Sequence, residues 1–533
     1  MAKTVGEALV GLLEDYGIDT VFGIPGTHSI ELYRGLENSK IRHISPRHEQ
    51  GGGFMADGYA RLSGRPAACF VITGPGVTNL STPMGQAYSD STPMLVISPV
   101  NPADSSGDNV GRLHEIKDQT SVTQDLAAFS KVAADQETLR DLVHDAFTVF
   151  ASERPLPAHI HVPLPLFTEE ASGNWSVRNL PGPPEPAAAG IEEAARMIDE
   201  AERPIIILGG GIARSREAAL ALVEGLNIPA VTTTNGKGTL PLDHPLSLGS
   251  TLTATPTQDL IASCDLLIAV GTELSKTDYW RENLQLPARK IVVNLDGDLL
   301  DRMGPECCCI EADAAATARA LGKAAARRPE NPIQADCDKA RSDIAASGLT
   351  DKQKTHRAVL DAIRDALPEN ASIFTDMTQI AYSGNAYYPS AMFGNWFHPI
   401  GYGTLGYGLP AAMGAKLAEP DRAVVALVGD AGYQYTMQEM ALAAELRLPV
   451  ILIMWNNDAL QQIADDMTDA DIANIGVVQK NPDFQMLAKA FGWATAHSLT
   501  LDDLSAAIGA ALEANGPSFI EVRDPEIRAS LAL

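Results

Sequence analysis

The chain has 533 residues, a hydrophobic fraction of 45% and a formal net charge of −27. This length predicts about three or four domains, and the hydrophobic fraction is normal for a globular protein. The charge disfavours nucleic acid and anionic membranes as partners, because both repel an acidic surface. The sequence contains no run of about 18 apolar residues and begins without an apolar signal segment, which favours a cytoplasmic enzyme.

Six cysteines are too few for a disulfide framework in a chain of this length. Three of them are adjacent: Cys307, Cys308 and Cys309. Neighbouring residues of a strand point to opposite faces, so the three cannot converge on one metal ion. We therefore expect this run to belong to a buried strand that continues into Ile310.

The first third of the chain alternates helical and strand patterns. A helix and three short strands are predicted at 5–16, 20–22, 41–45 and 67–73. Glu49 follows the second strand, just before a glycine-rich stretch and a helix predicted at 54–63. A turn at Gly74 leads into another helix. This alternation predicts a doubly wound α/β domain, residues 1–180.

The proline-rich stretch 181–186 indicates a semi-rigid linker to a second α/β unit at 190–325. Its strands are predicted at 204–208, 230–233, 266–270 and 291–295. The glycines 209–211 could cradle a dinucleotide, although a lone glycine turn is weak evidence. A polar stretch with helical character, from about 324 to 350, leads to the last domain, 350–533.

The third domain carries the most specific motif. An apolar run at 423–428 predicts a strand buried on both faces, and Asp430 follows it after one glycine. A helical segment (437–446) and a second buried strand (449–455) lead to Asn457. A crossover helix between parallel strands places Asp430 and Asn457 at one edge of the sheet, where their oxygens could bind Mg²⁺.

The separation of these two residues, 457 − 430 = 27 positions, matches the metal-binding motif of thiamine diphosphate (ThDP) enzymes. The other matching motifs are Gly23-Ile24-Pro25-Gly26, Arg47-His48-Glu49-Gln50, Gly74-Pro75-Gly76 and Gly-Thr-Leu-Gly-Tyr-Gly-Leu-Pro at 403–410. Over essentially its whole length, the chain resembles the ThDP-dependent group of acetohydroxyacid synthases, pyruvate oxidase and 2-oxo acid decarboxylases. The resemblance implies three doubly wound parallel-sheet α/β domains.

The resemblance also implies roles for individual residues. Glu49 would hydrogen-bond N1′ of the ThDP aminopyrimidine, Leu405 would wedge under the bent cofactor, and the carbonyl of Gly403 would accept from its amino group. The implied Mg²⁺ ligands are Asp430, Asn457 and the carbonyl of Ala459. Further implied cofactor contacts are Gly26, Gly74, Gln379, Gly429, Ala431 and Gly432. Family members build each active site at a dimer interface, so we expect a homodimer or homotetramer.

Three departures argue against an acetohydroxyacid synthase. The sequence Thr-Glu-Leu-Ser-Lys at 272–276 lacks the Arg-Phe-Asp-Asp-Arg pattern of those FAD-binding synthases, so we expect no functional FAD in the central domain. His114 replaces their glutamine and is a candidate for proton transfer, with His28 as a second candidate. The alternative is that His114 is a solvated loop residue. Asp466 replaces the tryptophan that selects their second substrate.

Asp465 and Asp466 together disfavour a second anionic 2-oxo acid and suit a guanidinium tail, which donates in a planar fork. A solvated acidic helix face is the alternative. We therefore predict ThDP- and Mg²⁺-dependent decarboxylation of a 2-oxo acid to an aldehyde, similar to enzymes that act on 5-guanidino-2-oxopentanoate. The competing hypotheses are an acetolactate-forming carboligase without FAD, a flavin-dependent oxidase and a catalytically silent binding protein.

Overall fold

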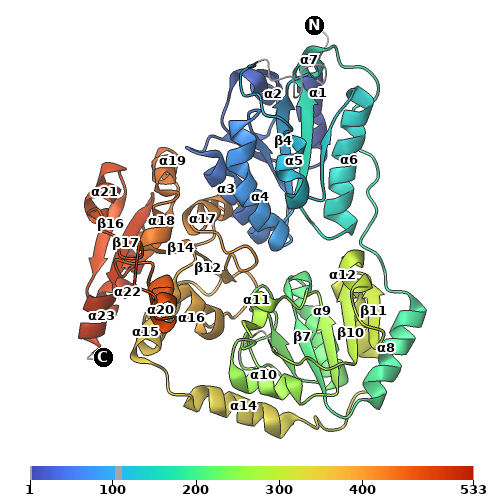
Figure 1. Cartoon of the computed structure of the whole chain (residues 1–533), viewed down its shortest axis with the longest axis vertical. Coiled ribbons are helices and arrows are strands. Elements are labelled where there is room, and N and C mark those ends of the chain that lie inside the picture. Colours follow the sequence, from blue (N-terminus) through green and yellow to red (C-terminus); the bar gives the residue numbers. More distant parts are fainter. Residues whose placement is uncertain (1–2, 103–110, 282, 532–533) are drawn as a thin grey trace.

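The computed structural model describes residues 3–102, 111–281 and 283–531. Figure 1 shows three α/β domains, with the N-terminal one at the top, the central one at the lower right and the C-terminal one at the left. Each contains a sheet whose strand pairs are all parallel in the described residues. The predicted fold class is confirmed.

The N-terminal sheet has the strand order β2-β1-β3-β4-β6-β5. Its strands are β1 (Thr20–Gly23), β2 (Arg42–Ile44), β3 (Ala67–Phe70), β4 (Met94–Val100), β5 (Phe129–Val132) and β6 (Ala158–Pro163). The helices of this domain are α1 (Val5–Asp15), η1 (Thr27–Ser29), α2 (Ile30–Glu37), α3 (Glu49–Ser63), α4 (Pro75–Ser89), α5 (Thr120–Thr123), η3 (Gln124–Leu126), α6 (Gln136–Ser152) and α7 (Leu164–Thr168). The last three strands were not predicted individually.

The central sheet has the order β11-β10-β9-β7-β8. Its strands are β7 (Pro204–Leu208), β8 (Ala230–Thr232), β9 (Leu266–Val270), β10 (Lys290–Asn294) and β11 (Cys307–Glu311). Its helices are α8 (Ala188–Glu200), η4 (Gly210–Ile212), α9 (Arg216–Leu226), α10 (Thr255–Ala262), α11 (Lys276–Tyr279), α12 (Gly297–Asp301), α13 (Ala314–Ala324) and α14 (Gln334–Ala346). The helical character predicted near 324–350 is present as α14, which buries Cys337 and Ala340 in the central domain.

The C-terminal sheet has the order β13-β12-β14-β15-β17-β16. Its strands are β12 (Ser372–Thr375), β13 (Trp396–Phe397), β14 (Val424–Gly429), β15 (Val450–Asn456), β16 (Ala494–Ser498) and β17 (Ser518–Arg523). Its helices are α15 (Asp351–Ala366), α16 (Gln379–Tyr387), α17 (Gly408–Ala418), α18 (Asp430–Tyr433), η5 (Met437–Glu439), α19 (Met440–Glu445), α20 (Gln461–Asp469), α21 (Phe484–Ala490), α22 (Leu501–Leu512) and α23 (Asp524–Ser530). Every residue of β14 and β15 is buried, as predicted.

The cysteine run lies in β11, so the predicted strand is confirmed, but the prediction that it is buried is wrong. Cys309 is exposed, and Cys307 and Cys308 are only partly buried. The reason is that β11 is an edge strand, which has a neighbour on one side only. No group of three His, Cys, Asp or Glu side chains suited to a metal ion occurs among the described residues.

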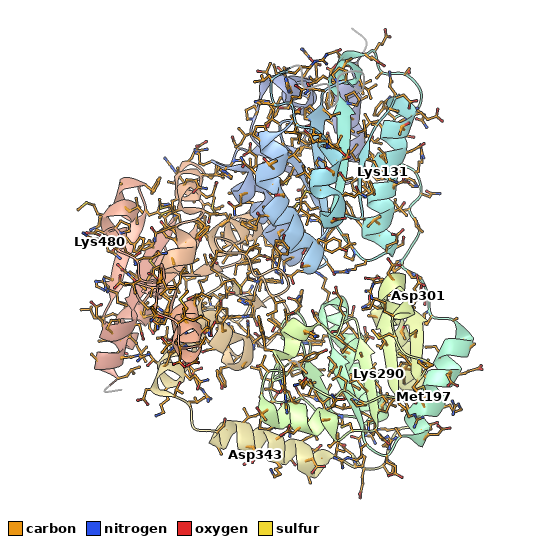
Figure 2. The ribbon with its side chains drawn as sticks, viewed as in Figure 1. Lys131, Met197, Lys290, Asp301, Asp343 and Lys480 are labelled. Carbon is orange, nitrogen blue, oxygen red and sulfur yellow. The ribbon has the colours of Figure 1, made fainter. Side chains whose placement is uncertain are left out.

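Each of the three domains carries charged side chains on its surface. The charged side chains of Lys131, Asp301 and Lys480 are exposed (Figure 2). In the part of the chain that the structure describes, no helix combines the length and the apolar composition needed to cross a membrane.

Helices α3 and α17 join the N- and C-terminal domains into one hydrophobic core. A Cβ atom on Gly58 would lie 2.0 Å from the carbonyl oxygen of Ala411, and one on Gly414 would lie 1.8 Å from that of Met55. The two helices therefore touch backbone to backbone at these glycines. No larger residue fits there unless the helices move apart.

Helix α3 begins at Glu49, earlier than the helix predicted at 54–63. The glycines before residue 54 are helical because neighbouring groups pack directly on them. A Cβ on Gly51 would lie 2.4 Å from Oε1 of Glu439, and one on Gly53 would lie 2.4 Å from Cβ of Pro83. These glycines permit close packing at the start of the helix.

Three contacts between the central domain and the other two are formed by cations that donate to main-chain carbonyls. Nη2 of Arg214 donates to the carbonyl of Arg61 at 2.6 Å, and Nζ of the buried Lys237 donates to that of Asn385 at 2.8 Å. The Arg216 guanidinium likewise donates to the carbonyl of Ala391. Each of these hydrogen bonds therefore depends on the position of a main-chain carbonyl in the neighbouring domain and not on a side chain there.

We expect Gly414→Ala to destabilise the protein by about 3 kcal/mol, because the added methyl group meets backbone that cannot move freely. Gly509→Ala is a matched control: it also lies inside a helix, but no atom is within 4 Å of its Cβ position. This control should be neutral or stabilising by up to about 1 kcal/mol. Denaturant unfolding measures both. Equal effects would contradict the backbone contact.

Candidate active site

The structure brings Asp430 and Asn457 together at the edge of the C-terminal sheet. Strands β14 and β15 pair in parallel up to Gly429 and Trp455, so the two residues follow adjacent strand ends. The main chain of Asn457 lies close enough to the Asp430 carboxylate to lower its pKa. The main-chain N–H of Ala459 donates to Oδ1 of Asn457 at 3.3 Å.

The surroundings of Asp430 fit a hard cation. Burial raises the pKa of its carboxyl group, against hydrogen bonds that lower it. Nδ2 of Asn481 donates to Oδ2 of Asp430 at 2.6 Å and to Oδ1 of Asp458 at 3.1 Å. The donor set of Asp430, Asn457 and the Ala459 carbonyl consists of oxygen atoms, as Mg²⁺ prefers. These residues therefore fit the metal that the resemblance implies.

Asp376 ties this edge of the sheet to the loop of Leu405, a role that the sequence analysis missed. Its buried carboxylate accepts from the main-chain N–H groups of Met377, at 2.8 Å, and of Gly406, at 3.0 and 3.1 Å. Burial raises its pKa to about 6. A Cβ on Gly432 would lie 3.0 Å from Oδ1 of Asp376, so the glycine lets the main chain pass close by.

Two more of the predicted cofactor positions lie in the same tight turn. Gly429 ends β14, and a Cβ there would lie 3.0 Å from the side chain of Thr378. Ala431 is buried in α18. Both positions leave the main chain, and not a large side chain, at the edge of the sheet.

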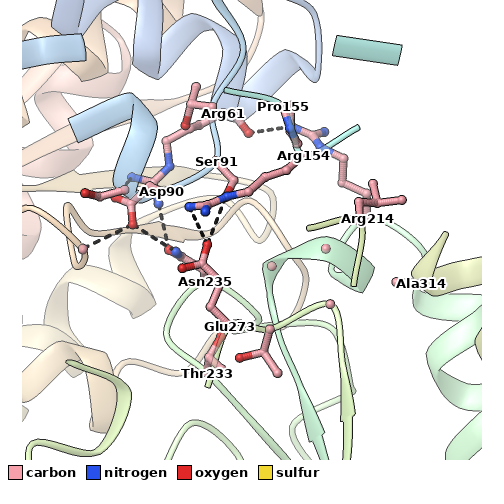
Figure 3. Close-up of a pocket in the computed structure, with 18 of the residues that line it drawn as sticks. Arg61, Asp90, Ser91, Arg154, Pro155, Arg214, Thr233, Asn235, Glu273 and Ala314 are labelled. Atoms are coloured by element: carbon pink, nitrogen blue, oxygen red, sulfur yellow. Dashed lines mark hydrogen bonds and ion pairs between the residues drawn. The ribbon is translucent and has the colours of Figure 1, made fainter. Parts of the chain in front are cut away.

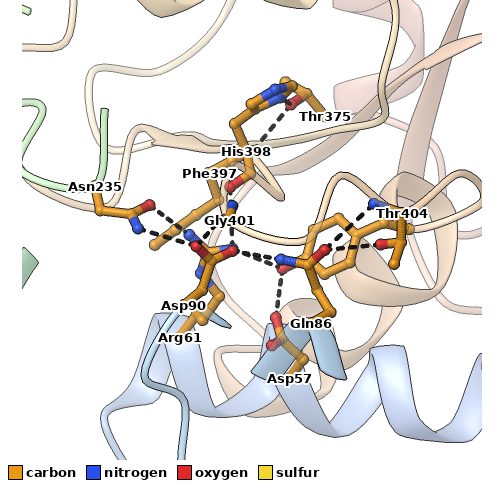
Figure 4. Close-up of polar contacts among 11 residues, drawn as sticks. Asp57, Arg61, Gln86, Asp90, Asn235, Thr375, Phe397, His398, Gly401 and Thr404 are labelled. Carbon is orange, nitrogen blue, oxygen red and sulfur yellow. Dashed lines mark hydrogen bonds and ion pairs between the residues drawn. The ribbon is translucent and has the colours of Figure 1, made fainter. Parts of the chain in front are cut away.

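The loop that carries the half-buried Leu405 is held by side chains of the N-terminal domain (Figure 4). Oγ1 of Thr404 donates to Oε1 of Gln86 at 2.9 Å, and the Tyr407 hydroxyl donates to Oδ1 of Asp57 at 2.5 Å. The position of Leu405 is therefore fixed from both sides.

A buried arginine connects the three domains at the same place (Figure 4). The Arg61 guanidinium lies 3.3 Å from Oδ2 of Asp90 and donates to Oδ1 of Asn235 at 2.8 Å. It also donates to the Tyr407 hydroxyl at 3.3 Å. Its charge is thus matched by Asp90 and shared with neutral acceptors, as a buried cation requires.

The N-terminal candidates form a second group. Glu49 is the first residue of α3, and its Oε2 accepts from Nδ2 of Asn79 in α4 at 3.0 Å. The rings of His28 and His114 meet edge to face, with centroids 5.2 Å apart. Nδ1 of His28 lies 3.3 Å from Oγ1 of Thr73, and desolvation lowers the His28 pKa. The structure thus pairs the two predicted histidines.

The main chains of His114 and Gly74 lie in close contact. His114 has a φ of 61°, and a Cβ on Gly74 would lie 2.5 Å from its carbonyl oxygen. The N–H of Gly74 donates to Oε1 of the buried Gln119 at 2.9 Å, a contact that no sequence motif indicated. Within the described residues, the buried Nδ1 of His114 has no hydrogen-bond partner.

The other two predicted glycines differ in their surroundings. The N–H of Gly26 donates to Oγ of Ser29 at 3.1 Å, and a Cβ there would lie 2.1 Å from Cδ1 of Ile72. Gly403 has a φ of 69°, the left-handed region, and only Met377 is near its Cβ position. Gly403 therefore leaves room beside the Leu405 loop.

The two neighbouring carboxylates on α20, those of Asp465 and Asp466, differ in their partners. Oδ2 of Asp465 accepts from Nζ of Lys352 at 2.6 Å and from Nε2 of Gln379 at 2.8 Å. Asp466 is exposed, and its carboxylate accepts from Nε2 of Gln462 at 3.0 Å. The charge of Asp465 is thus matched by Lys352, whereas that of Asp466 is not matched by a cation in the described structure. The predicted cofactor contact Gln379 lies against this helix.

A cavity of about 380 Å³ lies between the domains (Figure 3), and neither Asp430 nor Asn457 is among the residues that line it. Arg154 crosses its rim and forms ion pairs with Glu273 at 2.6 Å and Asp296 at 3.0 Å. Gly211 lines it, but its N–H donates to the carbonyl of Gly271 at 2.9 Å. At least one N–H group of the glycine turn at 209–211 is therefore already hydrogen-bonded within the central domain.

Comparison with known proteins gives a consistent result. Residues 3–122, 191–321 and 376–522 match the N-terminal TPP binding, central and C-terminal TPP binding domains of thiamine pyrophosphate enzymes, respectively. The chain is 47% identical over 528 residues to a protein of Pseudomonas aeruginosa named "Probable 2-ketoarginine decarboxylase", covering 98% of this chain and 94% of that protein.

Two further similarities are more distant. Identity is 32% over 535 residues to the acetolactate synthase isozyme 1 large subunit of Escherichia coli, with 98% of this chain and 94% of that protein covered. A solved structure from Mycobacterium smegmatis, described as a thiamin diphosphate-dependent enzyme, superposes with a TM-score of 0.83 at 23% identity, covering 98% and 99% of the two chains. This last likeness shows the fold alone.

We expect Asp430→Ala to remove Mg²⁺-dependent binding of ThDP, because the implied metal site, which would neutralise the diphosphate, would lose its carboxylate. Calorimetry of ThDP binding with and without Mg²⁺ measures this. Asp458→Asn is the matched control: Asp458 shares Asn481 but pairs with Arg523. This variant should bind ThDP within about threefold of wild type. Unchanged affinity in Asp430→Ala would place the metal elsewhere.

Proposed function

Because the chain belongs to the thiamine pyrophosphate enzyme family, we propose that it decarboxylates 5-guanidino-2-oxopentanoate with ThDP and Mg²⁺. The 2-oxo acid would take up one proton and be converted to an aldehyde and CO₂. The choice of substrate rests on the carboxylate of Asp466, which accepts a hydrogen bond from Gln462 but has no cation beside it in the described structure. The neighbouring Asp465 already forms an ion pair with Lys352. A guanidinium would match the remaining charge with a planar pair of donors.

When bound, ThDP supplies the electron sink that decarboxylation of a 2-oxo acid requires. Asp430, Asn457 and the Ala459 carbonyl would hold Mg²⁺ against its diphosphate. Glu49, oriented by Asn79, would hold a proton at N1′ of the aminopyrimidine.

Further contacts to the cofactor would come from Leu405 beneath it and from the Gly403 carbonyl. The pair His28 and His114 would deliver the proton that the product carbon takes up. The unpartnered, buried Nδ1 of His114 supports this role.

We also propose a homodimer or homotetramer in which each site combines the Glu49 group of one copy with the Asp430 group of another. The activity would need no FAD, and the six free cysteines fit a reducing compartment such as the cytoplasm.

An acetolactate-forming carboligase is the second candidate, because of the 32% identity to an acetolactate synthase subunit. The two functions are distinguished by their product. Purified protein supplied with ThDP, Mg²⁺ and either pyruvate or the guanidino acid should release CO₂ and an aldehyde from the guanidino acid. Acetolactate from pyruvate as the main product would replace the proposed function by the second candidate.

Glu49→Gln should lower turnover by about 10²- to 10⁴-fold, because an amide cannot exchange a proton with N1′. ThDP binding should change little, since the Mg²⁺ ligands are untouched. Steady-state kinetics and calorimetry measure the two effects. Turnover within about threefold of wild type would refute the role of Glu49.

Asp466→Asn should lower kcat/KM for the guanidino acid by about ten- to a hundredfold, the value of one charge-assisted contact. The kcat/KM for an uncharged 2-oxo acid should change little. Asp465→Asn is the control of equal size and charge change, and it should have the smaller effect on selectivity because Lys352 already matches Asp465. An equal loss of kcat/KM for charged and uncharged substrates would argue that Asp466 does not bind the guanidinium group of the substrate.

A further inference from the structure

A buried carboxylate of the C-terminal domain lies directly beneath the residues that precede Glu49. Glu439, the last residue of η5, is completely buried. Its carboxylate accepts from the main-chain N–H of Arg47, at 3.1 Å to Oε1 and 3.0 Å to Oε2, and from that of His48, at 3.0 Å to Oε1. Arg47 and His48 immediately precede Glu49, the first residue of α3.

The sequence is shaped to admit this carboxylate. Gly51 lies in the first turn of α3, where any side chain would overlap the carboxyl group of Glu439. N–H groups at the start of a helix point away from the helix body and lack intrahelical partners, so they attract an anion. Burial raises the Glu439 pKa to about 7, while the hydrogen bonds from Arg47 and His48 lower it. The hydrogen bonds from Arg47 and His48 therefore offset part of the cost of burying this carboxylate.

We propose that Glu439 is a positioning residue for Glu49: by fixing the main chain of residues 47 and 48, it sets where the Glu49 carboxylate points. The proposal rests on the function proposed above for Glu49. Two contacts then restrict Glu49. Glu439 holds the main chain just before it, and Nδ2 of Asn79 donates to Oε2 of its carboxylate at 3.0 Å.

A second glutamate of the same domain offers a control. Glu445 forms an ion pair with the side chain of Arg47, and both side chains are partly or largely exposed. Glu445 and Glu439 therefore contact the same residue, one through its side chain at the surface and one through its buried main chain. An exposed ion pair contributes little, so removing Glu445 should leave the main chain before Glu49 in place.

The experiment compares Glu439→Ala, Glu439→Gln and Glu445→Ala in the full-length protein. In the cofactor-free protein, amide hydrogen exchange at residues 47 and 48 should be about ten- to a hundredfold faster in Glu439→Ala, as expected for loss of a hydrogen bond to a charged group. With ThDP, Mg²⁺ and substrate, kcat should fall by a similar factor, while KM and ThDP affinity stay within about threefold. Glu439→Gln keeps one acceptor oxygen and should recover part of both losses. Glu445→Ala should match wild type in all measurements.

Unchanged exchange at residues 47 and 48 in Glu439→Ala would overturn the proposal. A fall in kcat accompanied by an equal loss of ThDP affinity in both Glu439 variants would overturn it too, since that pattern indicates general damage to the C-terminal domain. If Glu439→Ala does not fold, the same two readouts apply to Glu439→Gln. The exchange measurement needs no substrate. A protein that fails to decarboxylate the guanidino acid would therefore contradict the proposed function without deciding the outcome for Glu439.

Discussion

The arrangement of the molecule depends on the contact between α3 and α17, which two glycines allow to touch backbone to backbone. This contact fixes the N-terminal domain on the C-terminal one within a single hydrophobic core. Glu49 stands at one end of α3, and Arg61 lies near the other. Because a helix is stiff over this length, fixing it at Gly58 also fixes what its two ends can reach.

Buried hydrogen bonds around this contact fix the positions of the packed domains relative to one another. Arg61, Asp90 and Asn235 are mutually bonded and belong to two domains, while Gln86 and Asp57 hold the loop of Leu405. A buried polar group that loses its partner costs about 1–3 kcal/mol, so each hydrogen bond resists a shift of the domains. Apolar packing alone would tolerate small sliding movements far better. Loops that carry candidate site residues are thereby held to a narrow range of positions.

Local patterns in the sequence were sufficient to predict the parts of the site that depend on a single segment. The apolar runs that become β14 and β15 indicated buried parallel strands, and the turn after each strand indicated where Asp430 and Asn457 lie. The contacts of Asn481 and Gln119 could not be predicted in this way, because their partners are 51 and 45 residues away in the sequence. Such pairs arise only when separate elements pack.

Strand order is likewise not encoded locally, which explains the wrong prediction of a buried cysteine strand: β11 is at the edge of its sheet. The burial of Glu439 could not be predicted locally either, because its partners Arg47 and His48 are 392 and 391 residues away in the sequence. The early start of α3 is a similar case, because the groups that pack on Gly51 and Gly53 come from distant segments.

The attachment of the central domain through Arg214, Arg216 and Lys237 has an evolutionary consequence. The acceptors are main-chain carbonyls, which every amino acid carries whatever its side chain. Residues on the accepting side can therefore be exchanged over generations without loss of these bonds, provided the chain keeps its course. At these three contacts selection should act on the cations and on backbone shape. The side-chain pairs at the same boundary, such as Arg61 with Asn235, instead constrain both partners.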